Sequence, residues 1–228
     1  MSTSYPFMPV VINNTTSFFV DSGNTKSYVG TGTSWLDLSS YSNNCTLVNT
    51  PGFTNTRGGI LGFDGVTEYA TIPYSSQFDL SVNFALEAWF TMSGSNGIII
   101  SKDTNGVNFD WCIYMPNSTT ISIYSNGTAT NITSSPFTSI SDGLFHHCVI
   151  TGTSGFIEIY LDGKLVGSGS MSISNASTTG TFVTIGCGSW NSPGLFFNGY
   201  IPIVRVYKDG LTSSKVLQNY NATKNRFI

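Results

Sequence analysis

The chain has 228 residues, of which 40% are hydrophobic, 14% are aromatic and only 9% are charged. A net charge of −3 with scattered lysines and arginines excludes a basic nucleic-acid-binding surface, and no apolar run approaches the roughly 20 residues that a membrane-spanning helix needs. The hydrophobic content is too high for a disordered chain and predicts a packed core.

Short segments with strand character follow one another along the chain, each bounded by Gly, Asn, Ser or Asp. In chain order they are residues 17–21, 59–65, 69–72, 84–90, 97–101, 109–115, 121–124, 145–151, 156–163, 182–186 and 199–207. Short strands at this spacing, with no helical period between them, are typical of antiparallel sandwiches and jelly rolls. We therefore predict an all-β, antiparallel two-sheet jelly-roll sandwich.

The segment from residue 156 to residue 166 has the clearest strand pattern. Ile157, Ile159 and Leu161 alternate with more polar residues, which predicts a strand with one buried and one polar face. Asp162–Gly163 then predicts a type I′ turn into a returning strand.

The end of the chain contains an interrupted strand and the one predicted helix. Pro202 removes a ladder hydrogen bond from the last strand, which predicts an edge or a bulge there. Thr212 is a suitable N-cap for a short helix on which Val216, Leu217 and Tyr220 recur at one-turn spacing.

The domain organisation follows from the absence of any internal repeat or linker. We predict one domain over residues 16–228, preceded by an N-terminal arm over residues 1–15. The arm contains the apolar run YPFMPVVI, which suits docking on a neighbouring subunit. It lacks the charged region and long apolar core of a secretory signal, so we expect no export by that route.

Six segments carry a family resemblance: VDSGNTKSYVGTGTSWLDLSSYSNNCTL, GGILGFDGVTEYATIP, FALEAWF, DGLFHHCVIT, IYLDGKLVGSG and FFNGYIPIVRVYKDGLTSSKVLQNYNATKNRF. In this order, over residues 17–228, they resemble the laminin-G-like/concanavalin A-like jelly-roll family, in the branch common in bacteriophage and other viral structural proteins. The chain departs from the family pattern at Phe145, where a Trp is usual, and at Cys45, where a Gly is common. The resemblance implies a concanavalin A-like sandwich with one short C-terminal helix.

The chain's only two histidines are adjacent and precede a cysteine, in the order His146, His147, Cys148. Zinc sites and Cys/His pairs need side chains that converge, whereas neighbouring strand residues point to opposite faces. The resemblance also implies that this pair lies in a core strand. We therefore interpret the two histidines as structural residues.

Carboxylates are too few and too widely spaced for the paired acids of a glycoside hydrolase. The only glutamates are Glu68, Glu87 and Glu158, and none begins a glycanase motif. Glu158 and Asp162 are four residues apart on one strand, about 13 Å by strand rise, which is too far for such a pair. We predict a protein that is not an enzyme and has no Asp or Glu pair within about 10 Å in an open cleft, with Glu87 as a structural hydrogen-bond acceptor.

The family resemblance implies that calcium can bind at the rim of the sandwich, although no cofactor is required. Oxygen donors that suit calcium are Asp21 in VDSGN, and Asp103, Asn105 and Asp110 in KDTNGVNFD. The alternative is that these residues form turns without a metal.

Candidate ligand contacts are aromatic residues that lie beside amide groups. Trp190 and Asn191 in GSWNSPG, together with Trp111 in NFDWCIY, are the candidates for a sugar platform. Trp35 and Trp89 lie in segments that match the family pattern, and we assign them to the core.

The four cysteines, Cys45, Cys112, Cys148 and Cys187, match no disulfide framework or metal motif. Three of them lie in apolar or glycine-flanked stretches, where a reduced cysteine acts as a small buried hydrophobe. We predict free thiols and assembly in a reducing compartment.

These observations lead to a functional hypothesis with one alternative. We expect a non-enzymatic virion structural protein, assembled in the host cytoplasm, that decorates the capsid surface and binds capsid or other virion proteins through its arm. The alternative is a carbohydrate-binding adhesin, or a tail or fibre module, that attaches to host surface glycans. Both hypotheses imply an oligomeric assembly, without nucleic-acid binding or membrane insertion.

Overall fold

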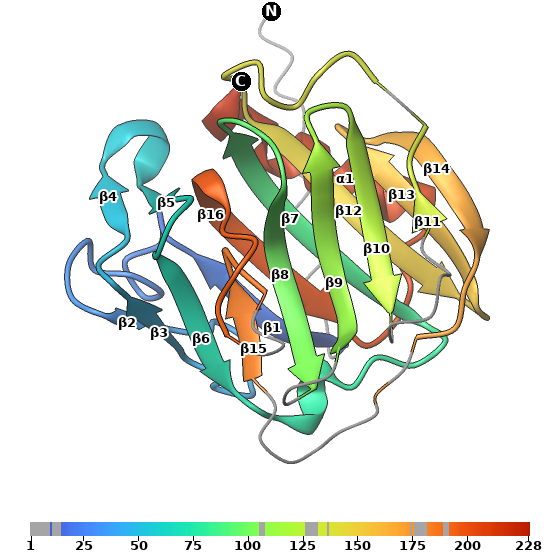
Figure 1. Cartoon of the computed structure of the whole chain (residues 1–228), viewed down its shortest axis with the longest axis horizontal. Coiled ribbons are helices and arrows are strands. Elements are labelled where there is room, and N and C mark those ends of the chain that lie inside the picture. Colours follow the sequence, from blue (N-terminus) through green and yellow to red (C-terminus); the bar gives the residue numbers. More distant parts are fainter. Residues whose placement is uncertain are drawn as a thin grey trace, which may run out of the picture.

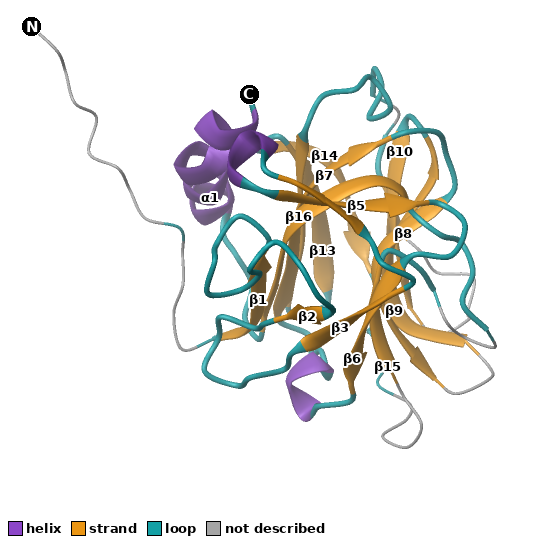
Figure 2. Cartoon of the chain, turned by 90° about the vertical axis from the view of Figure 1, so that its left-hand side faces the viewer, coloured by secondary structure: helices purple, strands orange, loops and turns teal. Residues whose placement is uncertain are grey.

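Two antiparallel β-sheets pack face to face in the computed structural model, which describes residue 10 and residues 15–104, 108–125, 132–135, 137–173, 175, 182–188 and 192–228. A C-terminal helix covers the outer face of one sheet (Figure 1 and Figure 2). The predicted jelly-roll sandwich with one short helix is confirmed. Most of the predicted arm, residues 1–9 and 11–14, lies outside the described residues. No helix in the described part of the chain is long and apolar enough to cross a membrane.

The first sheet contains the strands that carry the helix. Across the sheet they follow the order β14 (Lys164–Ser170), β13 (Phe156–Leu161), β12 (His146–Thr153), β7 (Phe84–Met92), β16 (Asn198–Tyr207), β5 (Ile60–Asp64) and β4 (Gly52–Thr54), and β1 (Thr16–Asp21) also pairs with β16. The two ends of the domain are therefore joined, because β1 and β16 come from opposite ends of it.

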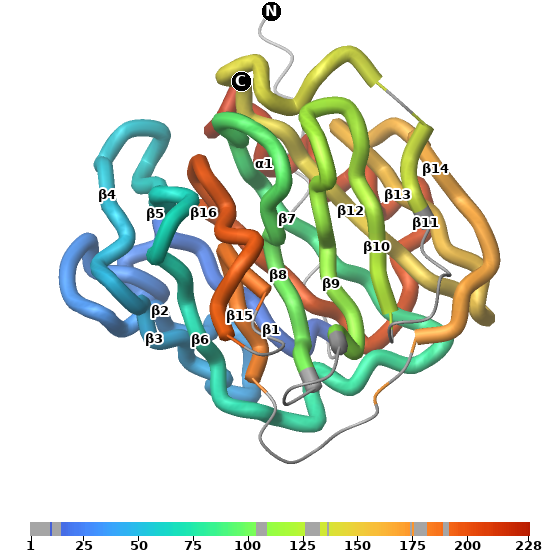
Figure 3. Tube along the Cα trace, viewed as in Figure 1, coloured from blue at the N-terminus to red at the C-terminus, as the bar shows by residue number. Residues whose placement is uncertain are grey.

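The second sheet packs against the inner face of the first. Its order is β11 (Ile132–Thr133), β10 (Thr120–Ser125), β9 (Asn108–Asn117), β8 (Gly97–Thr104), β15 (Phe182–Ile185), β6 (Tyr69–Pro73), β3 (Cys45–Val48) and β2 (Ser34–Trp35). The late strand β15 lies between β6 and β8, which come from the first half of the chain (Figure 3). Two short 3-10 helices, η1 (Thr56–Gly58) and η2 (Ser76–Phe78), connect strands.

Every strand predicted from the sequence is present. The strands that periodicity did not predict are β2, β3, β4 and β11, which have two to four residues each. The Asp162–Gly163 turn is confirmed, because both residues have positive φ, 51° and 77°, between β13 and β14.

The helix α1 (Ser213–Phe227) explains why the part of the outer face that it covers is not polar. Its N-cap is Thr212, as predicted, whose hydroxyl accepts the Lys215 N–H at 3.4 Å. Tyr160, which the alternation placed on the polar face of β13, is buried beneath Val216 of the helix. The strand β7 is buried along its whole length for the same reason.

The bulge predicted at Pro202 is also confirmed, and it has a role in the sheet. The register of β16 against β7 shifts between Tyr200 and Ile203. Before the shift β16 pairs with β5, and after it β16 pairs with β1. The proline therefore lies where the last strand changes its neighbour.

Candidate ligand-binding site

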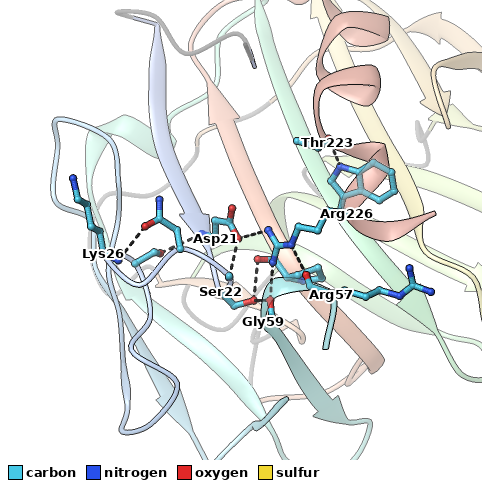
Figure 4. Close-up of polar contacts among 12 residues, drawn as sticks. Asp21, Ser22, Lys26, Arg57, Gly59, Thr223 and Arg226 are labelled. Atoms are coloured by element: carbon cyan, nitrogen blue, oxygen red, sulfur yellow. Dashed lines mark hydrogen bonds and ion pairs between the residues drawn. The ribbon is translucent and has the colours of Figure 1, made fainter. Parts of the chain in front are cut away.

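Asp21, the first predicted calcium ligand, is held by a cation of the chain itself. One of its oxygens accepts hydrogen bonds from the backbone of Gly23 at 2.9 Å and from Arg226 at 2.6 Å. Arg226 extends from the end of α1 and also donates to the carbonyl oxygens of Gly59 and Arg57 (Figure 4). A calcium ion on Asp21 would have to displace this guanidinium.

The second predicted calcium loop has both of its aspartates buried. Asp103 accepts a hydrogen bond from Ser101 at 3.0 Å, and Asp110 lies 2.8 Å from the ammonium group of Lys102. Asn105 lies outside the described residues. Among the described residues, no group of three or more His, Cys, Asp or Glu side chains is arranged to hold a metal ion. Calcium binding by this loop stays a prediction.

The predicted sugar platform is only partly within the described chain. Trp190 and Asn191 lie outside the described residues. Trp111 is fully buried, and its indole N–H donates to the Phe78 carbonyl at 3.0 Å. The prediction that Trp111 contacts a ligand is therefore wrong, because a ring with no exposed face cannot stack on a sugar. Trp35 and Trp89 are core residues, as predicted.

The two histidines make separate contacts on β12. His146 lies between Asp162 and Asp142, with ring nitrogens 2.9 and 3.2 Å from their carboxylates. His147 points to the other side, where its Nε2 contacts Glu87 at 2.9 Å. The prediction that the two side chains point to opposite faces of one buried strand is confirmed.

Glu87 is confirmed as a structural hydrogen-bond acceptor. It accepts from Tyr207 at 2.9 Å, from Asn219 of α1 at 2.7 Å and from Arg205, in addition to His147. This carboxylate joins β7, β12, β16 and the helix, and it is fully buried. It is therefore not accessible to a ligand.

The four cysteines are all described, and each is a buried free thiol, as predicted. Burial raises the pKa of each of them, that of Cys187 to about 12. A thiol in this state is neither a nucleophile nor a metal ligand at neutral pH.

An open groove of about 420 Å³ lies on the outer face of the first sheet, beyond the end of the helix. Strands β4, β5 and β16 form its floor, and the turns that follow β5 and β7 form its margins. Leu61 and Phe63 point into the core, so Gly62 and Asp64, which alternate with them, face the groove. The lining residues are Gly52, Phe53, Thr54, Gly62, Phe63, Asp64, Glu68, Ser93, Asn198, Gly199 and Tyr200.

Tyr200 and two glycines form the centre of this groove. Tyr200, Gly62 and Gly52 are register partners across three neighbouring strands, so they form a row on one face. A Cβ at Gly62 would lie 2.9 Å from the Tyr200 ring, so only glycine lets the ring lie over β5. A Cβ at Gly52 would meet no atom within 4 Å. The result is an exposed aromatic ring beside an open, glycine-floored trough.

The pKa values of two carboxylates at the margin of the groove, Asp64 and Glu68, are shifted in opposite directions. Asp64 accepts hydrogen bonds from the backbone of Val66 and Thr67 at 2.8 Å and of Glu68 at 2.9 Å. Desolvation raises the pKa of Asp64, but these hydrogen bonds outweigh it and lower that pKa to about 2. Desolvation and the charge of Asp64 raise the pKa of Glu68. The prediction that no pair of carboxylates lies within about 10 Å in an open cleft is wrong, because both of these line the groove and the backbone N–H of Glu68 reaches Asp64 at 2.9 Å.

Little in the sequence pointed to this groove. Strand β4, which forms part of the floor, has only three residues and is too short to show a period. Tyr200 lies two positions before Pro202, where the bulge interrupts the alternation of β16. The alternation of Leu61, Gly62, Phe63 and Asp64 indicates a strand with one apolar face. The role of Gly62 depends on its pairing with Tyr200 on β16, which the sequence does not show.

Comparison with known proteins shows which family the fold resembles. A family profile described as the concanavalin A-like lectin/glucanases superfamily matches residues 64–217. The binding domain of botulinum neurotoxin serotype G has a TM-score of 0.67 and 14% identity, over 90% of this chain and 50% of that one. The binding domain of botulinum neurotoxin DC, solved with rat synaptotagmin II, has a TM-score of 0.68 and 14% identity, over 93% and 52%.

A third similar structure is domain 4 of AbnA, a GH43 extracellular arabinanase from Geobacillus stearothermophilus, solved in complex with arabinotriose. It has a TM-score of 0.65 and 15% identity, over 91% of this chain and 98% of that domain. The chain therefore spans about half the length of the toxin domains and nearly all of the arabinanase domain. At these identities the likeness is one of fold.

Proposed function

Because the chain belongs to the concanavalin A-like lectin/glucanases superfamily, we propose that it is a non-catalytic glycan-binding module whose ligand lies in the groove beside Tyr200. The observation that carries the proposal is the exposed Tyr200 ring beside the open trough over Gly52. The apolar face of a sugar ring stacks on such an aromatic ring. Asn198 and Glu68 at the margin offer hydrogen-bonding groups to its hydroxyls. The similar arabinanase domain was solved with arabinotriose.

A binding role fits the two carboxylates of the groove better than hydrolysis does. A glycoside hydrolase needs one carboxylic acid to protonate the leaving group and a second carboxylate to act as nucleophile or base. Asp64 is committed to its own turn, because one oxygen accepts three backbone N–H groups and the other accepts the Thr67 hydroxyl at 3.1 Å. Its low pKa is the result of holding that turn, which shapes the groove.

The first test is the substitution Tyr200→Ala, read out by glycan-array binding and titration calorimetry. Tyr200 is 38% exposed, which leaves roughly 75 Å² of an aromatic side chain of roughly 200 Å² in solvent. Covering half of that area contributes about 1 kcal/mol at ~25 cal/mol/Å², so the variant should bind about fivefold more weakly. The matched control is Tyr41→Ala, which removes a similarly exposed tyrosine (43%) outside the groove.

A second variant blocks the trough without removing any contact. A Cβ at Gly52 would have no neighbour within 4 Å, and this glycine is exposed on β4. Gly52→Leu should therefore leave the melting temperature close to that of the wild type while abolishing binding. Glycan binding that survives both Tyr200→Ala and Gly52→Leu would place the ligand elsewhere. Hydrolysis of a bound oligosaccharide by the wild type would contradict the non-catalytic role.

The virion setting expected from the sequence is a further part of this proposal. It rests on the six ordered segments that resemble the branch common in viral structural proteins. A capsid decoration protein should bind empty capsids stoichiometrically and lose that binding when residues 1–14 are deleted, with glycan binding unchanged. An adhesin, or a tail or fibre module, should bind glycans and leave empty capsids unlabelled.

A further inference from the structure

A buried lysine lies between two carboxylates, and none of the three lines the groove. Lys102 of β8 is fully buried, and its Nζ lies 2.6 Å from Asp79 Oδ1 and 2.8 Å from Asp110 Oδ2. Asp110 is buried as well, whereas Asp79 keeps 28% of its side chain exposed. The Tyr74 hydroxyl donates to the second oxygen of Asp79 at 2.8 Å.

The surroundings hold Asp79 firmly against the lysine. Phe78, the preceding residue, is fully buried, and its carbonyl accepts the Trp111 indole N–H. The Asp79 carbonyl accepts from Lys208 at 2.7 Å. Trp111 is the register partner of Lys102 on the neighbouring strand β9. The pair β8 and β9 therefore positions the Lys102 amine and, through the Trp111 hydrogen bond, the backbone beside Asp79.

We propose that Lys102 and Asp79 condense to an intramolecular amide, with Asp110 as the catalytic residue that transfers the protons. The three groups around the lysine have the roles that this reaction needs. Asp79 presents a carboxyl oxygen to the amine, the Tyr74 phenol polarises that carboxyl group, and Asp110 contacts the amine as a second carboxylate. Holding the reactants at such a distance replaces a bimolecular encounter, which lowers the barrier to amide formation from a carboxylic acid and an amine.

The step balances without any further reactant. Asp110 takes a proton from the Lys102 ammonium, and the neutral amine attacks Cγ of Asp79 to form the C–N bond. The C–O bond of Asp79 breaks, and its oxygen leaves as water with two of the three ammonium protons, delivered through Asp110. The third proton stays as the amide N–H. The exposed edge of Asp79 gives the water a path to solvent.

Burial favours the product. The starting state keeps the Lys102 ammonium and the Asp110 carboxylate out of water and part of Asp79 as well, which costs desolvation free energy, whereas the amide is neutral and leaves only the Asp110 carboxylate behind. The cross-link ties the segment after β6 to β8 and closes the chain around β7. It supplies a covalent connection in a chain whose four cysteines are all free thiols.

The experiment is intact-mass measurement of the purified, denatured full-length protein, followed by peptide mapping. The wild type should be lighter than its sequence by one water molecule, and a branched peptide should join Lys102 to Asp79. Lys102→Arg keeps the charge but cannot form the amide, and Asp110→Asn removes the proton carrier, so both variants should have the full sequence mass.

The wild-type measurement decides the proposal even where a variant fails to fold. A full sequence mass in the wild type overturns it. So does a water loss that maps to a succinimide at an Asp–Gly pair, such as Asp64–Gly65, which mild base reverses whereas an amide cross-link persists. A branch from Lys102 to Asp110 overturns the assignment of Asp79 as the acceptor.

Discussion

Replacing Glu87 by glutamine tests what holds the helix on the first sheet. The substitution keeps the size of the side chain but removes its charge, and the Arg205 guanidinium then stays buried without a counter-ion. Glu87 accepts from His147, Tyr207 and Asn219 as well as from Arg205, and an amide cannot serve all four donors. Breaking a buried ion pair from one side costs about 3–5 kcal/mol, so we expect Glu87→Gln to lower the free energy of unfolding by about 3 kcal/mol.

The assay is urea unfolding followed by circular dichroism, together with a melting curve. A loss of about 3 kcal/mol corresponds to a decrease of roughly 6–12 °C in the melting temperature for a domain of this size. The matched control is Glu158→Gln, a half-buried carboxylate on the same sheet whose contact is a 3.1 Å hydrogen bond from Tyr160, and its effect should stay below about 1 kcal/mol. An equally small effect of Glu87→Gln would refute the reasoning.

The pH dependence of this difference gives a second check. Burial raises the pKa of Glu87, but the charge of Arg205 and the hydrogen bonds from His147 and Tyr207 outweigh it and lower that pKa to about 2. A carboxylate whose pKa is lower in the folded state stabilises the fold at any pH above its unfolded pKa, here about 4.5. That stability is lost as the pH falls from about 4.5 toward 2. The advantage of the wild type over Glu87→Gln should therefore shrink below about pH 4.5.

Two further predictions concern the ends of the same sheet. Arg226→Ala removes the contact with Asp21 and two hydrogen bonds to carbonyl oxygens, so it should lower the free energy of unfolding by about 1–2 kcal/mol. Amide hydrogen exchange in the last turn of α1 should become faster, and unchanged exchange there would contradict this. Burial lowers the pKa of His146, but Asp162 and Asp142 outweigh it and raise that pKa above 6.5. The stability that His146 contributes over His146→Gln is then complete below about pH 6.5 and is lost as the pH rises through the folded value; a difference that grows between about pH 6 and pH 9 would be the wrong sign.

The elements with a periodic local pattern could be predicted from the sequence, whereas contacts between residues far apart in the chain could not. The strands with several alternating aliphatic residues, such as β13, and the capped helix were visible because local pattern determines them. The sequence predicted Asp110 as a calcium ligand but did not predict its contact with the ammonium group of Lys102, which lies earlier in the same stretch. Asp79 completes that cluster from a separate loop, and no spacing rule connects it to Lys102.

The outer face of the first sheet has two halves that share one row of aromatic rings. Phe227 at the end of the helix lies 5.0 Å from Phe145 by ring centroids, and Phe145 lies 6.4 Å from Tyr200. The guanidinium of Arg57 lies over Phe145, and Arg57 also donates to the Phe227 carbonyl. The helix therefore ends where the groove begins. The contacts that anchor its last turn also support the Tyr200 ring, so the helix both covers one half of the sheet and positions the proposed binding surface on the other half.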